Sequence, residues 1–162
     1  MRRVIVGLGA ATAVVGLSVV AQAATKTTTF TVSLTITADC TVSAANLTFP
    51  STGVIASNVD QSSNISVTCT NTTPYNVGLD KGLNGSNVTA RLLNAGAAEN
   101  VSYALYRDSN RTLNWGETIG TDTVSDTGNG SAKTHTVYGR VPAQTSPSPA
   151  TYTDTITVTV TF

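Results

Sequence analysis

Few side chains in this sequence are of types that do chemistry, and none stands in a catalytic or metal-binding pattern. His135 is the only histidine, and its Lys-Thr-His-Thr setting predicts a solvent-facing side chain on a strand. Cys40 and Cys69 lack the C-x-x-C spacing of metal and redox motifs. No G-x-S-x-G or glycine-rich phosphate loop occurs. The sequence therefore predicts a non-enzymatic protein with no cofactor and no metal.

Two polar or aromatic groups could still bind a ligand. Four carboxylates gather in the second half of the chain, at Asp108, Glu117, Asp122 and Asp126. They could hold a cation, but they do not follow the alternating ligand pattern of a calcium loop. Trp115, with Tyr103 and Tyr106, could form a platform for a sugar, although a tryptophan more often packs in a core. Both interpretations stay open at the level of sequence.

Residues 1–23 have the layout of a secretory signal peptide. Arg2 and Arg3 precede an apolar run from Val4 to Val20, and Ala21-Gln22-Ala23 supplies small residues for cleavage. The run is near the lower length limit for a transmembrane helix, and no basic stop-transfer cluster follows it. We therefore expect cleavage after Ala23, rather than a membrane anchor, and a mature chain without a membrane span.

Export and composition narrow the function classes further. An exported chain meets an oxidising compartment, so we expect a Cys40–Cys69 disulfide rather than two buried thiols. Closing that loop would stabilise the fold by about 3–4 kcal/mol on chain-entropy grounds.

Only 11% of the residues are charged, and no basic patch for nucleic acid is present. A surface of Thr, Ser and Asn suits close packing between copies of the chain.

Alternation of apolar and polar residues predicts an all-β protein with about eight strands. Seven of them can be bounded in the sequence: Phe30–Ile36, Ile65–Cys69, Tyr75–Leu79, Val88–Leu93, Val101–Arg107, Thr134–Val141 and a last run, Tyr152–Phe162. Asn84-Gly85 and Asn129-Gly130 predict tight turns with positive φ. Such spacing of strands and turns is typical of a one-domain β-sandwich.

Both ends of the mature chain are long, alternating and almost uncharged. The run Thr25–Thr37 carries only Lys26, and the final run continues to Phe162. Soluble proteins usually protect strand edges with charges or bulges, because open edges pair with other chains. We therefore expect these two runs to pair with another chain.

Several segments together resemble one family, the spore coat protein U domain. Its Y-x-L-Y-x-D…R…W-G motif is similar to Tyr103-Ala104-Leu105-Tyr106-Arg107-Asp108, followed by Arg111 and Trp115-Gly116. Further similar segments are Cys40-Thr41-Val42, Cys69, Val137–Pro142 and Tyr152–Val160. The resemblance covers essentially the whole mature chain.

That family includes the major pilins of archaic chaperone–usher pili in Gram-negative bacteria. The resemblance implies an immunoglobulin-like sandwich that lacks its last strand, which a periplasmic chaperone supplies first. At the outer-membrane usher, the N-terminal segment of the next subunit would replace the chaperone (donor-strand exchange). The product would be a linear homopolymer on the cell surface, serving adhesion and biofilm formation. Backbone hydrogen bonds would supply affinity, and alternate side chains would fill pockets.

The resemblance assigns these roles to particular residues. Residues 24–37 would be the donor segment and residues 38–162 the pilin domain. The pocket-filling side chains would be Phe30, Val32, Leu34 and Ile36. The edge of the acceptor groove would be formed by Ile156, Val158, Val160 and Phe162. A shaft position is favoured, because one domain carries both a donor and a groove.

Two other functions remain as alternatives. One is a secreted coat protein of a spore or cell surface, from the same family. The other is a self-contained carbohydrate-binding sandwich that uses the aromatic platform at Trp115. A lectin would pair its N-terminal run within its own sheet, whereas a pilin would leave that run for a neighbour.

Overall fold

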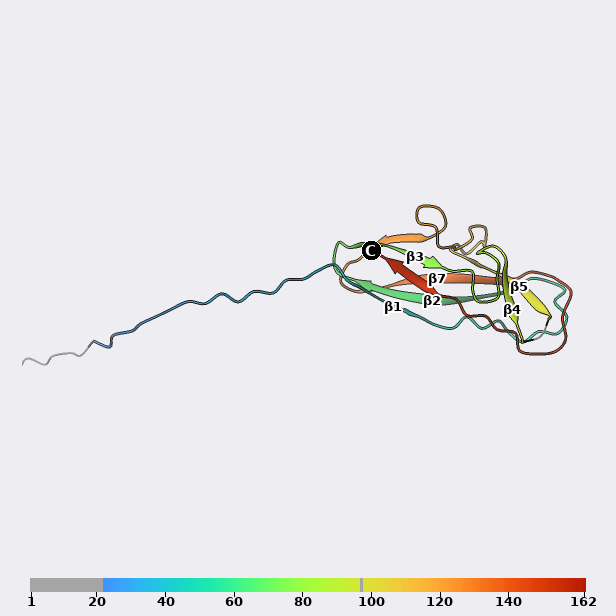
Figure 1. Ribbon diagram of the computed structural model, residues 1–162, viewed down its shortest axis with the longest axis horizontal. Helices are drawn as coiled ribbons and strands as arrows, with labels where there is room; N and C mark the ends of the chain where they lie inside the picture. The colour runs from blue at the N-terminus through green and yellow to red at the C-terminus, as the bar shows by residue number, and fades with distance from the viewer. Residues whose placement is uncertain (1–21, 97) are drawn as a thin grey trace, which may run out of the picture. The chain divides into compact units, whose positions relative to one another are not determined.

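The computed structural model describes residues 22–96 and 98–162, which contain eight strands and no helix (Figure 1). The strands are β1 Cys40–Ala44, β2 Val59–Cys69, β3 Pro74–Leu79, β4 Arg91–Asn94, β5 Asn100–Tyr106, β6 Val124–Thr127, β7 Ala132–Val141 and β8 Val158–Thr161. Most of the predicted signal peptide, residues 1–21, lies outside the described residues. No helix in the described part has the length and hydrophobicity to span a bilayer.

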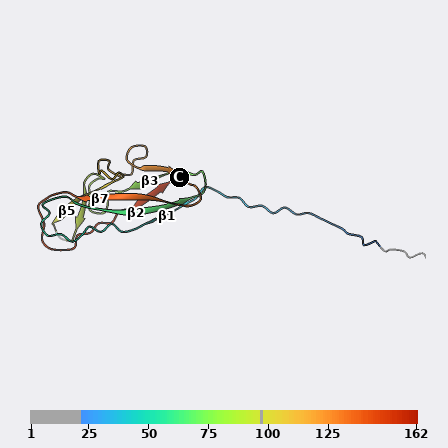
Figure 2. The same ribbon diagram turned by 180° about the vertical axis from the view of Figure 1, so that it is seen from behind.

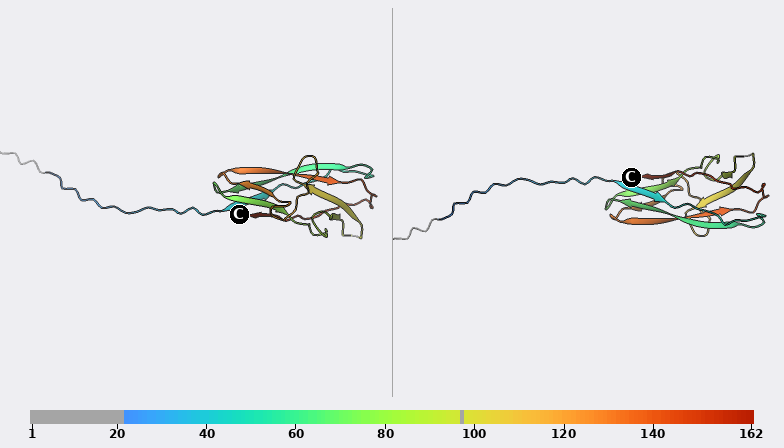
Figure 3. Two further views of the ribbon diagram at one scale, coloured as in Figure 1. Left: turned by 90° about the horizontal axis from the view of Figure 1, so that it is seen from above. Right: turned by 90° about the horizontal axis from the view of Figure 1, so that it is seen from below.

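The strands form two antiparallel sheets, with the orders β1-β2-β7-β5-β4 and β6-β3-β8. Figures 2 and 3 show these sheets layered in a sandwich. β2 and β7 pair from Val59↔Val141 to Thr68↔Ala132 and form the centre of the larger sheet. The core lies between the sheets, and alternate residues of β2, β3, β5 and β7 supply it. The fold is therefore all-β, as the alternation predicts.

Two large side chains with polar groups lie inside this core, Trp115 and Arg91. The Trp115 indole N–H donates to the Val77 carbonyl at 2.8 Å. The Arg91 guanidinium donates to the carbonyls of Leu79, at 3.0 Å, and Trp115, at 2.8 Å. Because their donors are paired, these groups can be buried without leaving unsatisfied hydrogen bonds.

The predicted disulfide is confirmed. Cys40 and Cys69 are bonded to each other, and they also pair across the β1–β2 ladder. The bond joins the first residue of β1 to the last residue of β2. The edge strand β1 is thus tied covalently to its neighbour.

Several strand predictions need correction. Phe30–Ile36 forms no strand, β4 begins at Arg91 rather than Val88, and β8 takes only part of the run Tyr152–Phe162. β1 and β6 were not predicted as strands; both are short, and β1 is largely exposed while β6 has a mainly polar sequence. The described residues therefore form eight strands, but these are not all the segments that were predicted.

The two Asn-Gly turns differ. Gly130 has a φ of 78°, as expected for the Asn129-Gly130 turn. Neither Asn84 nor Gly85 has a positive φ, so that prediction is wrong. A β-carbon at Gly85 would collide with the carbonyl oxygen of Lys81. Glycine is needed there for close approach of two backbone segments rather than for its φ.

The chain divides into two units, Met1–Leu34 and Thr35–Phe162. In the first unit, the described residues 22–34 have no regular secondary structure and are exposed. Phe30 is 87% exposed and Leu34 86%. The second unit contains both sheets, and all the sites described below belong to it.

Candidate strand-acceptor groove

β8 is an edge strand whose core-facing side chains are incompletely covered. It pairs with β3 through Leu79↔Val158 and Val77↔Val160, and paired residues share one face of a sheet. Leu79 and Val77 are fully buried, whereas Val158 and Val160 are only partly buried. The core is therefore closed over β3 and open at β8.

The backbone of β8 is open on the same side. The Asp80 amide donates to the Thr157 carbonyl at 3.2 Å, so Thr157 faces β3. Because backbone groups alternate along an antiparallel strand, those of Val158 and Val160 point away from β3. Among residues 22–96 and 98–162, no strand pairs with that side of β8. Backbone and side chains at these two residues are both available to another strand.

β1 shows a similar opening in the larger sheet, and it approaches β8. Val42 pairs with Val67, which is fully buried, so Val42 faces the core. Val42 is nevertheless 44% exposed. Both edge strands, β1 and β8, thus leave core-facing side chains partly uncovered.

The segment after β1 packs on the core without joining either sheet. Residues 47–54 belong to no strand, and Leu47 and Phe49 are partly buried while Thr48 and Pro50 are exposed. No hydrogen bond joins the backbone of residues 47–54 to another described residue. An alternating segment with free backbone groups resembles a strand without a partner.

We call the partly covered core surface at β8, Val42 and the segment Leu47–Phe49 the candidate acceptor groove, or acceptor groove for short, and Leu47–Phe49 its wall. Of the residues predicted for its edge, Ile156, Val158 and Val160 are partly buried and pack on the core. Phe162 lies beyond the end of β8 and is 56% exposed. The predicted donor side chains are all exposed: Phe30, Val32, Leu34 and Ile36.

A half-buried polar cluster around Asp154 precedes β8. Asp154 accepts hydrogen bonds from the Leu83 amide at 2.9 Å and from the Tyr103 hydroxyl at 2.7 Å. Burial raises the pKa of Tyr103, and its bond to Asp154 acts in the same direction. Gly82 has a φ of 76°, and a β-carbon there would collide with the Asp154 carboxylate. The sequence contained a signal for this cluster, since Tyr103 and Asp154 both belong to the resembling segments.

The aromatic platform is not present. Trp115 has 0% exposure and Tyr103 is buried, while Tyr106 is half-buried. A sugar cannot stack on rings that lie inside the core. The interpretation of Trp115 as a core residue is therefore the correct one.

His135 was predicted to face solvent, and this prediction is wrong. It pairs with the buried Ile65 and therefore faces the core. Its Nε2 atom lies 2.9 Å from the Tyr75 hydroxyl in a hydrogen bond. Burial lowers the pKa of His135, so the imidazole is neutral at pH 7.

Three of the four carboxylates have separate partners. Asp108 accepts from the Leu113 amide at 2.8 Å, and Asp122 accepts from the Thr118 amide at 2.7 Å. Asp126 forms a 2.7 Å ion pair with Lys133, and Glu117 is exposed. The described residues hold no group of three or more His, Cys, Asp or Glu side chains that could bind a metal.

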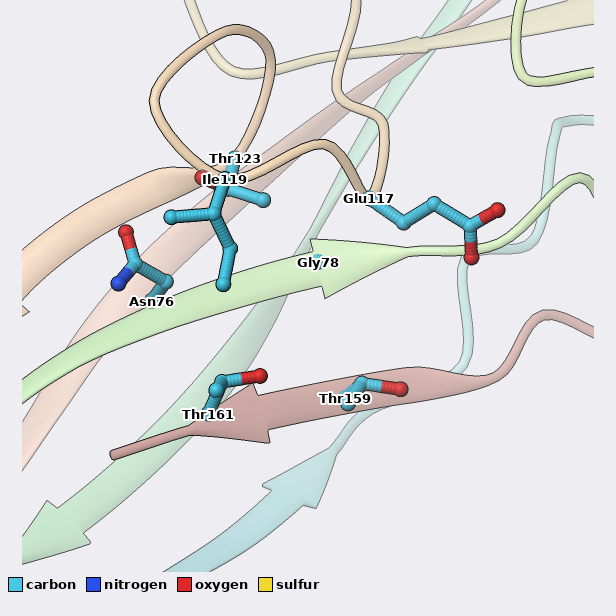
Figure 4. Close-up of a pocket in the computed structure, with 7 residues that line it drawn as sticks. All are labelled: Asn76, Gly78, Glu117, Ile119, Thr123, Thr159 and Thr161. Atoms are coloured by element: carbon cyan, nitrogen blue, oxygen red, sulfur yellow. The ribbon is translucent and has the colours of Figure 1, made fainter.

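A small hollow of about 180 Å³ lies on the opposite face of β3 and β8 (Figure 4). It is lined by Asn76, Gly78, Glu117, Ile119, Thr123, Thr159 and Thr161. Thr159 and Thr161 alternate with Val158 and Val160 along β8, so they point to the other side of the sheet. This hollow is therefore distinct from the acceptor groove.

A protein-family model matches most of the chain. The Spore Coat Protein U domain matches residues 26–159. The chain belongs to the spore coat protein U domain family. Among curated proteins, no match was found.

A solved structure similar to this spore coat protein U domain is the CsuC–CsuE chaperone–tip adhesion subunit pre-assembly complex from archaic chaperone–usher Csu pili of Acinetobacter baumannii. One of its chains matches with a TM-score of 0.59 and 25% identity over 79% of this chain. The match covers only 40% of that chain. With the open edges described above, this likeness confirms the prediction of an incomplete immunoglobulin-like sandwich.

The motif residues of this spore coat protein U domain serve the fold. The Arg111 guanidinium lies over the Tyr138 ring, 5.7 Å from its centroid, and also donates to the Gly139 carbonyl at 3.2 Å. Asp108 closes the turn that leads to Trp115 by accepting backbone amides. These contacts give the aromatic, acidic and basic residues of the motif structural roles in packing and hydrogen bonding.

Proposed function

We propose that this chain is a structural subunit of a cell-surface pilus that polymerises by donor-strand exchange. Residues 24–37 of one copy occupy the acceptor groove of the next copy, and repetition produces a linear homopolymer. The family of the chain and its likeness to a pilus-subunit complex support this assignment. Adhesion and biofilm formation are the roles we assign to such a fibre, and catalysis has no part in it.

One observation carries the proposal: in the described part of the chain, core-facing side chains stay partly uncovered at β8 and β1, and an alternating apolar run is exposed. Val158, Val160 and Val42 face the core but keep exposed area. Phe30, Val32, Leu34 and Ile36 alternate along residues that are exposed. Burying one such side chain contributes about 1.5–3 kcal/mol, so both surfaces gain by meeting.

Backbone pairing supports the same arrangement. A strand in the groove can bond to the free groups of Val158 and Val160 on one side and to the segment Leu47–Phe49 on the other. Strand addition of this kind derives its affinity from main-chain hydrogen bonds and its specificity from alternate side chains. The donor would extend the β6-β3-β8 sheet and close the core.

The open groove also explains the partners that we assign. A free subunit with an uncovered apolar edge would aggregate, so a periplasmic chaperone must cover the groove until assembly. An outer-membrane usher would then exchange the chaperone for the next subunit. This route requires export through the signal peptide, cleavage after Ala23, and display on the cell surface.

The experiment that tests the proposal contrasts the two faces of the donor run. Leu34→Asp places an unpaired carboxylate in the groove, at a cost of several kcal/mol, and should block polymerisation. Ser33→Asp lies on the opposite face of an extended strand and should be much milder. Surface pili of both variants are counted by electron microscopy at matched periplasmic levels of subunit.

Equal assembly by both variants, or a larger defect in Ser33→Asp, would contradict the assignment of the donor face. The subunit fold serves as the internal control. Both residues are exposed and outside every strand of the chain itself, so the circular dichroism spectrum should remain that of the parent.

A further inference from the structure

Gly139 stands at an unusual place for a glycine. It lies within β7, between β2 and β5, and pairs with Gln61 and Leu105. Leu105 is buried, so Gly139 is on the core face of the sheet. Glycine weakens a strand interior and often marks a site where another group approaches closely.

The group that approaches Gly139 is the wall of the acceptor groove. A β-carbon at Gly139 would lie 2.9 Å from Leu47 Cδ1 and 3.0 Å from Phe49 Cζ. The φ of Gly139 is outside the left-handed region, so its backbone does not require glycine. The bare backbone at this position is needed to receive the tips of these two side chains.

Packing on Gly139 is important because little else holds the wall. Ser63 Oγ donates to the Ala45 carbonyl at 2.7 Å before the segment, and the Ile55 amide donates to Ser146 Oγ at 2.7 Å after it. Between these two attachments, the backbone of residues 47–54 has no hydrogen bond to the rest of the described chain. Side-chain packing therefore sets the distance of the wall from the core.

We propose that Gly139 is a positioning residue for strand acceptance. It is a socket for Leu47 and Phe49, and by seating them it sets the width of the acceptor groove between the Leu47–Phe49 wall and β8. This inference rests on the proposed function. The atoms nearest to a β-carbon at Gly139 belong to the Leu47 and Phe49 side chains and not to backbone. A larger residue there would therefore push these two side chains, and the Leu47–Phe49 wall with them, away from the core. The pairing of β7 with β2 and β5 would remain.

The test measures binding of a labelled synthetic peptide, residues 24–37 of this chain, by fluorescence anisotropy, with the mature full chain refolded at high dilution in the presence of the peptide so that the groove is not left uncovered. Gly139→Val should weaken binding by roughly tenfold or more, a size typical of overpacking, and Gly139→Ala should have a smaller effect in the same direction. Thr134→Val is the matched control, because Thr134 belongs to the same strand β7, is exposed and lies on the face opposite Gly139. It should bind the peptide like the parent.

A double variant separates positioning from general destabilisation. Gly139→Val combined with Leu47→Ala restores room in the socket, so it should bind the peptide better than Gly139→Val alone. Thermal unfolding is measured in parallel on each variant with a copy of Thr25–Thr37 appended after Phe162 through a flexible linker, and the loss of peptide binding should exceed any change in stability. Parent-like binding by Gly139→Val, or no recovery in a folded double variant, would overturn the inference.

A peptide carrying Leu34→Asp distinguishes this inference from the proposed function. If that peptide binds the parent chain as well as the unmodified peptide, the donor assignment itself fails. If it does not bind, while Gly139→Val binds the unmodified peptide normally, only the socket is wrong. If Gly139→Val does not fold, Gly139→Ala and the double variant decide the outcome by the same criteria.

Discussion

His135, Tyr75, Asp126 and Lys133 form one polar cluster between β3, β6 and β7. The Tyr75 hydroxyl is hydrogen-bonded to His135 and donates a longer bond, 3.5 Å, to Asp126. The hydrogen bond from Lys133 lowers the pKa of Asp126, and burial lowers the pKa of His135. The folded state therefore favours a neutral imidazole beside a charged carboxylate.

This cluster predicts a pH-dependent stability. An unfolded histidine has a pKa of about 6.5, and the folded value is lower, so the unfolded state binds more protons as the pH falls. The free energy of unfolding should therefore decrease between about pH 7.5 and pH 5.5. Urea unfolding of the parent and of His135→Gln over this range measures the effect. The variant should show a flatter dependence, and identical slopes would refute this account. Asp126 contributes at lower pH, where its own carboxylate becomes protonated.

At the scale of the elements, β1 depends on its disulfide. It has five residues, pairs only with β2 and is largely exposed, so burial contributes little to holding it. Replacing both Cys40 and Cys69 by serine should lower the free energy of unfolding by about 2–4 kcal/mol. Chemical denaturation measures this, and Ser43→Ala on the same strand is a control that should change little. Alkylation of the secreted protein without reduction should detect no free thiol by mass spectrometry.

The predictability of each element follows from how its side chains are buried. Strands β2, β3, β5 and β7 alternate between a buried and an open face, which leaves a period-two signal in the sequence. β6 is a short strand with the polar sequence VSDT, and only its pairing with β3 makes it a strand. The run Phe30–Ile36 alternates clearly but forms no strand, because periodicity reports a suitable face and not the presence of a partner.

The candidate site was predictable to a different extent on its two sides. The β8 side was visible as the alternation Ile156, Val158 and Val160. The Leu47–Phe49 wall was not, because two apolar residues are too few to give a periodic signal and the seat at Gly139 is distant in sequence. Contacts between segments so far apart require the folded structure.

At the scale of the whole molecule, the domain is expected to be unstable alone and complete when supplied with a strand. The mature chain lacking residues 24–37 should aggregate or stay bound to a chaperone, because its groove has nothing to cover it. Appending a copy of Thr25–Thr37 after Phe162 through a flexible linker should give a stable monomer. Size-exclusion chromatography with light scattering distinguishes these states.

The same appended segment with Leu34→Asp is the matched control and should fail to rescue the truncated chain. A truncated chain that is already soluble, monomeric and stable would contradict the incomplete-sandwich account of assembly.

The disulfide also determines how the domain would carry tension. In the proposed fibre, a pull on one subunit passes through residues 24–37 and enters the domain at Cys40. Without the bond, the hydrogen bonds of the short β1 strand would transmit the whole force to β2. The Cys40–Cys69 bond instead transfers it directly to the end of β2, which is paired with β7 along nearly its full length. A stretched fibre would therefore yield at the joints between subunits before β1 peels from its sheet.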